Sequence, residues 1–133
     1  MDFITDSSLL IDLWRENGKG GPANRFANDH AGAVIGLPWI VKGEFLRSAK
    51  NIGQIDESIK RFLDSFYMIW PTDQTLNVYA DLYGDLKKRG LMIGPHELWI
   101  AASALEHRVP LISRNTEEFR KIPDLAVVDY AAL

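Results

Sequence analysis

Three acidic residues occupy places in the sequence from which they could bind a metal ion together. Asp6 follows the first apolar stretch of the chain, Glu44 lies just after the second, and Glu97 opens a long apolar segment. Carboxylates that are crowded together repel each other unless a cation neutralises them, and Mg²⁺ binds through a few carboxylates, water and substrate phosphate. The three acids therefore predict a divalent-metal site, provided that the fold brings them together.

The elements that must position these residues alternate between strands and helices. Strands are predicted at residues 2–5, 33–41, 67–70, 109–113 and 125–130, and helices at residues 7–14, 42–50, 56–66, 72–90, 93–106 and 116–122. This alternation predicts an α/β fold in three layers, with a mainly parallel central sheet and helices on its two faces. Ligands of such sheets bind beyond the carboxyl ends of the strands, where Asp6, Glu44 and Asn115 are expected.

Local signals define several connections. Ser7 or Ser8 is placed to cap the first helix, and the glycine-rich segment "NGKGGPAN", residues 17–24, is predicted to be a loop. Pro38 is an unusual residue for a central strand. The helix at residues 72–90 is predicted to end on a glycine and carries an apolar stripe formed by Leu76, Ala80, Tyr83 and Leu86.

Each of the three acids also has a purely structural interpretation. Asp6 could cap the helix that follows it, since Asp is among the residues most favoured at that position. Glu44 could be a solvated acid near the start of its helix, where a negative charge suits the helix dipole. The sequence leaves these interpretations open beside metal binding.

Glu97 is the clearest example of this ambiguity. If Gly94 is the N-cap and Pro95 the first helical residue, Glu97 stands at the third position, where a capping-box Glu belongs. By helical spacing, however, Glu97 shares a face with Ala101 and Ala104. It therefore leans toward the packed side of the helix, where an unpaired charge is costly.

Composition limits the class of protein. The 133 residues are predicted to form one domain, residues 1–133, and 47% of them are hydrophobic. The absence of cysteine excludes disulfides, thiolate zinc sites and cysteine nucleophiles, and favours an intracellular location. The first residues lack the features of a signal peptide, and no apolar stretch approaches the ~20 residues that a membrane span needs. A cytoplasmic protein without a membrane partner is expected.

The net charge of −3, with 15 basic and 18 acidic residues, excludes a generally basic nucleic-acid-binding surface. Binding to a polyanion would need a local basic patch or metal ions held by the acids. Four basic residues lie beside Glu44 or Asn115 and could contact phosphates, although on most proteins such residues are solvated surface, and both interpretations remain open. They are Lys42, Arg47, Lys50 and Arg114.

Three segments closely resemble PIN-domain ribonucleases, and most nearly the VapC-type toxins of bacterial toxin–antitoxin pairs. They are "ITDSSLLIDL", "VKGEFLRS" and "IGPHELWIAASALEHRVPLISRNTEEFRKIPDLAVVDY", and the resemblance covers nearly the whole chain. In that family an Asp ends the first strand and a Thr or Ser follows it, which matches Asp6, Ser7 and Ser8. A Glu on the next helix matches Glu44, and an Asn or Asp after the penultimate strand matches Asn115.

The family's third acid corresponds to Glu97, with one departure. The family usually has Asp at this position, and the extra methylene of Glu lengthens the side chain by about one carbon–carbon bond. This departure supports an alternative in which the PIN fold holds RNA or a protein partner and cuts weakly or not at all.

The resemblance implies an endoribonuclease that depends on Mg²⁺ or Mn²⁺. Asp6, Glu44 and Glu97 would be the metal ligands, and Asn115 would complete or orient them. The implied substrate is a structured RNA cut in a single-stranded loop, such as a tRNA or rRNA loop. The implied partners are a second copy of the chain, giving a homodimer, and a cognate antitoxin whose tail places a basic side chain among the acids.

A zinc protease is a weaker alternative. The segment "HELWI" begins like the H-E-x-x-H motif, but Ile100 stands where the second His is required. The three histidines, His30, His96 and His107, are expected at the surface or in packing roles.

Overall fold

A parallel sheet lies at the centre of the molecule. The computed structural model describes residues 1–51 and 57–132. Within them the strands are β1 (Phe3–Thr5), β2 (Ile35–Pro38), β3 (Tyr67–Ile69), β4 (Leu111–Ser113) and β5 (Val127–Asp129). Their spatial order is β3-β2-β1-β4-β5 and all of these pairings are parallel, which confirms the predicted fold class.

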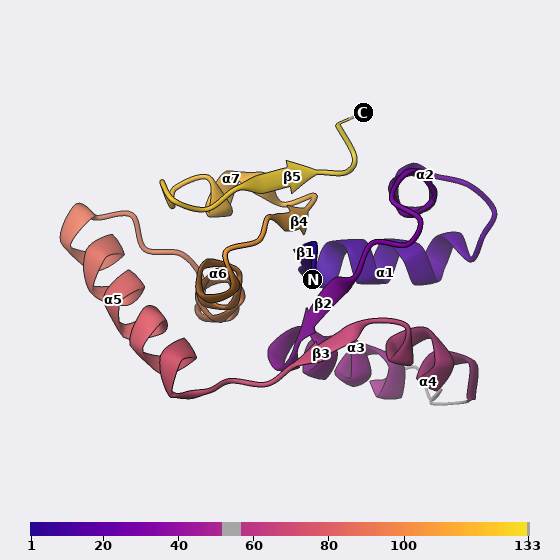
Figure 1. Cartoon of the computed structure of the whole chain (residues 1–133), viewed down its shortest axis with the longest axis horizontal. Coiled ribbons are helices and arrows are strands. Elements are labelled where there is room, and N and C mark those ends of the chain that lie inside the picture. Colours follow the sequence, from indigo (N-terminus) through magenta and orange to yellow (C-terminus); the bar gives the residue numbers. More distant parts are fainter. Residues whose placement is uncertain (52–56, 133) are drawn as a thin grey trace.

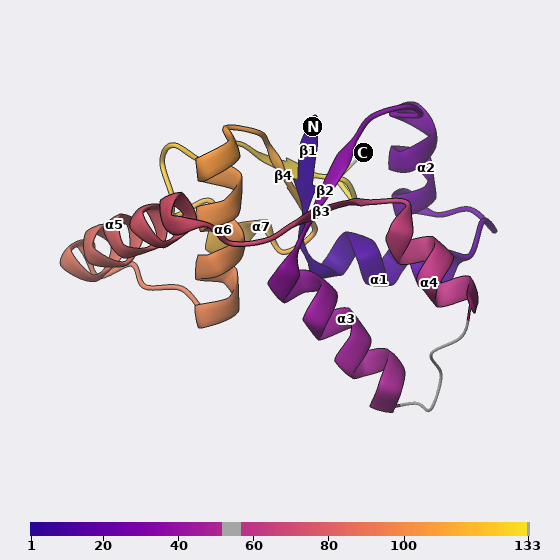
Figure 2. The ribbon, with the colours of Figure 1, turned by 60° about the horizontal axis from the view of Figure 1, so that its bottom comes forward.

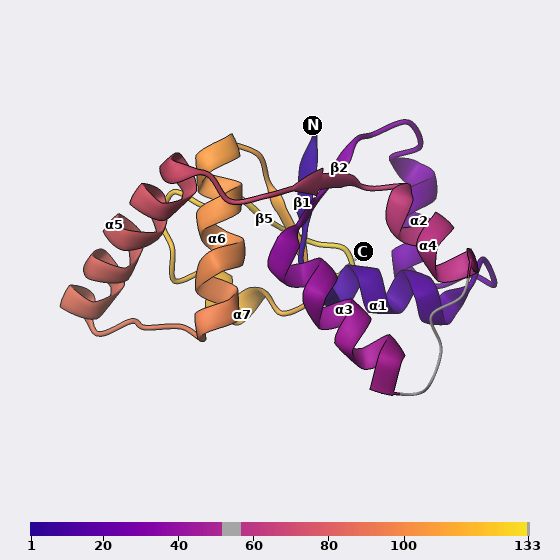
Figure 3. The same ribbon diagram turned by 90° about the horizontal axis from the view of Figure 1, so that it is seen from below.

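Helices cover both faces of the sheet (Figure 1). Helices α1 and α2 lie on one side, and α6 lies on the other with α5 packed beside it, as Figures 2 and 3 also show. None of the helices within the described residues is both long and apolar enough to cross a bilayer. The helices are α1 (Ser7–Glu16), α2 (Pro22–Asp29), α3 (Trp39–Asn51), α4 (Glu57–Asp64), α5 (Asp73–Arg89), α6 (Pro95–His107) and α7 (Thr116–Phe119).

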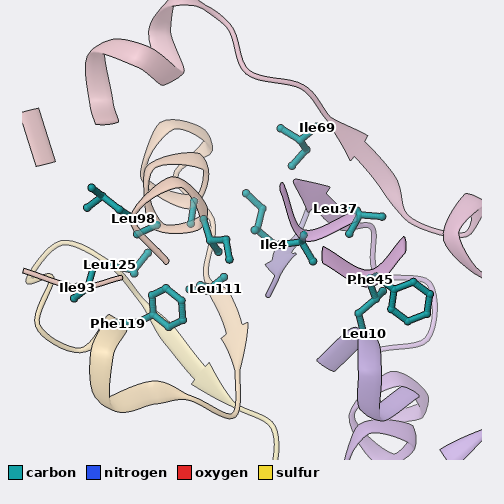
Figure 4. Close-up of a cluster of buried hydrophobic side chains, with 14 of the residues drawn as sticks. Ile4, Leu10, Leu37, Phe45, Ile69, Ile93, Leu98, Leu111, Phe119 and Leu125 are labelled. Atoms are coloured by element: carbon teal, nitrogen blue, oxygen red, sulfur yellow. The ribbon is translucent and has the colours of Figure 1, made fainter. Parts of the chain in front are cut away.

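The main hydrophobic core extends from α6 across β1 to α1 and α3 (Figure 4). Leu98 of α6 and Leu111 of β4 pack on one side of Ile4, while Leu10 and Phe45 continue the cluster toward α1 and α3. Each of these five side chains is buried. The core thus fixes the strand and helix ends that carry the candidate acids.

A smaller cluster fills the face that α1 and α2 cover. Because side chains alternate along a strand, Leu111 belongs to the main core while Ile112 belongs to this second cluster. Its buried members are Leu9, Ala23, Phe26, Ile112 and Tyr130.

The carboxyl ends of the three inner strands meet at one edge of the sheet. Strand β1 pairs with β2 on one side and with β4 on the other, and Thr5 is in register with Ile112. From β1 the chain adds β2 and β3 on one side and then β4 and β5 on the other. The end of β1 is therefore a topological switch point, where ligands of α/β proteins bind. Pro38 is the last residue of β2, where the strand ends, so it does not interrupt the pairing.

The structure decides which residue caps α1, since the sequence offered Asp6 as well as Ser7 or Ser8. Asp6, and not Ser7 or Ser8, is the N-cap of α1, and its carboxylate accepts the backbone N–H groups of Ser8 and Leu9. An Asp directly before the helix satisfies these N–H groups, so the serine hydroxyls are free for other partners.

Helix α2 was not predicted, because residues 17–24 have the composition of a loop. The loop ends at Gly21, and α2 begins at Pro22. Glu16, at the end of α1, accepts the backbone N–H groups of Ala23 and Asn24 at 3.2 and 2.9 Å, in place of a capping side chain at Gly21. Gly21 has a φ of 150°, and a Cβ there would lie 2.4 Å from the Glu16 carboxyl carbon, so only glycine fits.

The apolar stripe predicted for α5 was largely wrong. Leu76 and Tyr83 are 49% and 42% exposed, and the buried residues of α5 are instead Thr75, Leu82 and Leu86. The hydroxyl of Thr75 donates to Glu106 of α6 at 2.6 Å, which turns this polar residue inward. The helix predicted from Asp56 begins at Glu57 among the described residues, and Asp56 lies outside them.

Candidate active site

Asp6 is the centre of the site. It is 5% exposed, and both carboxylate oxygens accept hydrogen bonds. Its Oδ1 accepts from the hydroxyl of Ser8 at 2.6 Å and from the backbone of Ser8 at 3.0 Å. Its Oδ2 accepts a short hydrogen bond from the buried hydroxyl of Ser113, the last residue of β4. The neighbouring strand therefore fixes the orientation of this carboxylate.

The surroundings of Asp6 disfavour its negative charge. Burial raises the pKa of this carboxyl above its ordinary value of 3.8, and hydrogen bonds from Ser113, Ser8 and Leu9 offset part of the rise. No Lys, Arg or His within the described residues forms an ion pair with Asp6. A buried carboxylate with only neutral donors around it is a group that a cation would stabilise.

Glu44 bridges two other parts of the site. Its Oε1 accepts from the hydroxyl of Ser7 at 3.0 Å, and its Oε2 lies 3.0 Å from Nδ1 of His96. These contacts are possible because α3, which carries Glu44, packs against both α1 and α6 (Figure 3). Glu44 thus joins the residue after Asp6 to the residue before Glu97.

Glu97 stands at the third position of α6, as predicted, with Gly94 as N-cap and Pro95 as first helical residue. Its carboxylate folds back over the start of the helix, so close to Gly94 that a Cβ on this glycine would lie 2.2 Å from Oε2. Gly94 has no side chain to complete a capping box, and among the described residues no hydrogen bond or ion pair to the Glu97 carboxylate is found. The capping interpretation is therefore not supported by a capping bond.

The backbone of Asn115 is hydrogen-bonded to a partner of Asp6. Its N–H donates to the hydroxyl oxygen of Ser113 at 2.8 Å, and the N–H of the preceding Arg114 donates to Ser8 Oγ at 3.0 Å. Asn115 is exposed and begins α7 as its N-cap. Ser8 and Ser113 each bond to Asp6 on one side and to this loop on the other, so they link β4 and α1 around the carboxylate.

The acids surround one edge of the sheet without forming a ready-made metal centre. In residues 1–51 and 57–132, no three or more His, Cys, Asp or Glu side chains are placed so that they could hold a metal ion. Glu44 is directed to Ser7 and His96, and Glu97 to Gly94. The donors are nevertheless all oxygens of the kind that Mg²⁺ prefers, and the buried charge of Asp6 lacks a cation, so the residue types fit such an ion.

The basic residues of α3 are unevenly placed. Arg47 and Lys50 are exposed and line an open hollow of about 590 Å³. Arg47 follows Glu44 by nearly one turn, whereas Lys42 lies two residues before Glu44, roughly 200° around the helix. The structure therefore places Arg47 next to the Glu44 face of α3 and Lys42 away from it.

Comparison with known proteins identifies the family. The family model of the PIN domain matches residues 3–125 of the chain. This chain is a PIN-domain protein. Ribonuclease VapC1 of Haemophilus influenzae is 33% identical to it over 134 residues, covering 98% of each chain, and Ribonuclease VapC of Rickettsia bellii is 26% identical over 129 residues, covering 96% of each. The solved structure of VapBC-1 from nontypeable Haemophilus influenzae matches with a TM-score of 0.80 and 27% identity over 98% of each chain.

Two residues of this PIN domain's site were missed in the sequence. His96 was expected to be surface or packing but contacts Glu44, and Ser113 was not singled out although it bonds to Asp6. Ser113 could have been found from its position, since it ends the strand that pairs with β1. His96 had no comparable signal, because its partner is 52 residues away on another helix.

Proposed function

We propose that this PIN-domain protein is a Mg²⁺- or Mn²⁺-dependent endoribonuclease and the toxin of a toxin–antitoxin pair. Its membership of the PIN family and the names of its curated relatives, which are ribonucleases, support RNA as the substrate. The observation that carries the metal dependence is Asp6, a buried carboxylate at the sheet's switch point whose described partners are neutral donors. A divalent cation would compensate this charge.

In this proposal Asp6, Glu44 and Glu97 hold the ion. When bound, such an ion polarises a phosphate oxygen and lowers the pKa of an attacking water. Ser113 and Ser8 keep the Asp6 carboxylate in one orientation, which reduces the cost of assembling the site.

The remaining contacts determine how the other two acids would reach the ion. Glu44 is within hydrogen-bonding distance of Ser7 and His96, which hold its carboxylate at the edge of the sheet. Glu97 has to turn away from Gly94, a movement available to a side chain without hydrogen-bond partners among the described residues.

The partners of this protein belong to the same proposal. Solved structures similar to this chain include VapBC complexes, which supports a bound antitoxin. An arginine of an antitoxin tail could satisfy the clustered carboxylates with bidentate hydrogen bonds and so exclude the metal. We also expect a homodimer, and light scattering of the purified protein at micromolar concentration tests it. A monomer would contradict the dimer. Full inhibition by an antitoxin that lacks this arginine would contradict the role proposed for the arginine.

A second candidate function is a PIN-fold module that binds RNA or protein and cuts it weakly. The Glu at position 97 and the absence of a ready-made metal centre in the described residues favour it. Incubation with total RNA, with Mg²⁺ and with a chelator, separates the two. The endonuclease cuts RNA only with the metal, and Asp6→Asn abolishes the cut; intact RNA in both conditions would support the binding module.

A further inference from the structure

Asp12 is a partly buried acid of α1 that takes no part in the contacts of Asp6, Glu44 and Glu97. It lies one helical turn after Ser8 on α1, and its side chain is 15% exposed. Its Oδ2 accepts a hydrogen bond from the hydroxyl of Tyr130 at 2.5 Å and another from NH1 of Arg114 at 2.8 Å. One carboxylate oxygen therefore joins the end of β5, helix α1 and the loop after β4.

The backbone of Arg114 lies close to the carboxylate of Asp6. Its backbone N–H donates to Ser8 Oγ at 3.0 Å, and the hydroxyl of Ser8 donates to Asp6 at 2.6 Å. The side chain of Arg114 is 55% exposed, so the guanidinium lies at the surface while the backbone is two hydrogen bonds from Asp6.

The guanidinium of Arg114 has donors to spare. Arginine carries five N–H donors in a planar fork, and the contact with Asp12 engages NH1. The other donors can bind an oxyanion, and a planar fork matches phosphate bidentately. An arginine held by one edge next to a nuclease site is suited to a phosphate of the bound strand.

Tyr130 donates a hydrogen bond to Asp12, the carboxylate that binds Arg114. It is 1% exposed and packs in the second hydrophobic cluster with Phe26 and Ile112. Burial, together with the hydrogen bond to Asp12, raises the pKa of its phenol above the ordinary value of 10.0. The phenol therefore stays protonated at neutral pH and remains a donor to Asp12.

We propose that Tyr130 and Asp12 are positioning residues that hold Arg114 as a phosphate contact for the RNA strand. The identity of the strand as RNA rests on the proposed function. Asp12 and Tyr130 act through Arg114.

A simpler role for Asp12 leads to the opposite result. If Asp12 only neutralised Arg114, removing its carboxylate would expose a positive charge and strengthen RNA binding. If Asp12 positions Arg114, Asp12→Ala weakens binding although the protein becomes less negative. The sign of the change therefore separates the two roles.

The test is RNA affinity by fluorescence anisotropy, with a labelled single-stranded RNA and every variant made in an Asp6→Asn background that does not cut. Arg114→Ala should weaken binding about tenfold and lower the salt slope by about 0.7, the value for one lost phosphate contact on a single strand. Tyr130→Phe, which changes no charge, should weaken binding about threefold when Arg114 is present and have no further effect in Arg114→Ala. Tyr67→Phe, at an exposed tyrosine of β3, is the matched control and should change nothing.

Three outcomes would overturn the inference: unchanged binding in Arg114→Ala, an equal loss from Tyr130→Phe with and without Arg114, or tighter binding in Asp12→Ala. If neither the wild type nor Asp6→Asn binds RNA, the proposed function itself fails and the inference fails with it. RNA binding that persists unchanged in the Arg114 variants rejects the inference alone. Thermal melts of Tyr130→Phe and Asp12→Ala verify that each variant is folded.

Discussion

His96 and Glu44 lie on different helices, with Nδ1 of His96 3.0 Å from Oε2 of Glu44. This contact joins the first turn of α6, which carries Glu97, to α3. On its other side Glu44 accepts from Ser7, the neighbour of Asp6. The three candidate ligands are therefore connected through one chain of hydrogen bonds and adjacent residues, even though no metal centre is assembled among the described residues.

Replacing Glu97 separates a metal ligand from a helix-capping acid. Glu97→Gln keeps the shape of the side chain and can still serve at the third helical position, so a capping role predicts little change. As a ligand, Glu97 loses its charge, and metal-dependent RNA cleavage should fall by at least about a hundredfold. Glu97→Asp should keep or raise the activity, because Asp is the residue usual in the family.

The matched control for this prediction is Glu57→Gln, which removes an exposed first-turn Glu from α4. It should leave cleavage unchanged. Wild-type cleavage rates in Glu97→Gln would return Glu97 to a structural role.

Asp6 should make stability depend on pH. Because burial raises the pKa of Asp6 in the folded state, this group stabilises the fold most below its ordinary pKa of 3.8, and that stability is lost as the pH rises through the folded pKa. Asp6→Asn cannot ionise, and Asn caps a helix about as well as Asp. In chelator the variant should therefore melt at a higher temperature than the wild type at neutral pH, and this difference should shrink as the pH falls.

Melting curves followed by circular dichroism between about pH 7 and pH 4 measure this difference. The exposed Asp81→Asn on α5 is the control and should show no such trend. A melting temperature of Asp6→Asn that stays below that of the wild type by the same amount at every pH would show that folding does not disfavour the ionised Asp6.

Ser113 should stabilise the fold through Asp6. Ser113→Ala leaves the buried carboxylate without one of its donors and should lower the free energy of unfolding by about 1–3 kcal/mol. Cleavage should also fall by about tenfold to a hundredfold, as when an outer partner of a metal ligand is lost. Urea unfolding measures the first effect. Ser65→Ala, which removes an exposed local hydrogen bond, should cost less than about 0.5 kcal/mol; equal losses in the two variants would contradict the role of Ser113.

The sequence predicted elements whose signals are local. Asp6 after β1 and the Gly94–Pro95 start of α6 follow from cap and strand chemistry, and the structure has both. Helix α2 could not be predicted, because Glu16 caps it from across a glycine-rich loop. The buried face of α5 could not be predicted either, because Thr75 turns inward to meet a side chain of α6.

Some features of the candidate site could likewise be predicted from the sequence, and others could not. Asp6 directly follows β1, so its place at the carboxyl edge follows from the sequence pattern, whereas the partners of Glu44 depend on how α3 packs between α1 and α6. His96 belongs to the site only because of that packing. Helix packing is a property of the whole core, and a motif at one place in the chain does not contain it.

The central claim is that Asp6 anchors a divalent-metal site. Isothermal calorimetry with Mn²⁺ or Mg²⁺, titrated into the wild type and into Asp6→Asn, tests it without requiring an RNA substrate. We predict that the wild type binds the metal and that Asp6→Asn binds it at least about a hundredfold more weakly. Equal affinities in the two proteins, or no binding to the wild type, would contradict the metal site.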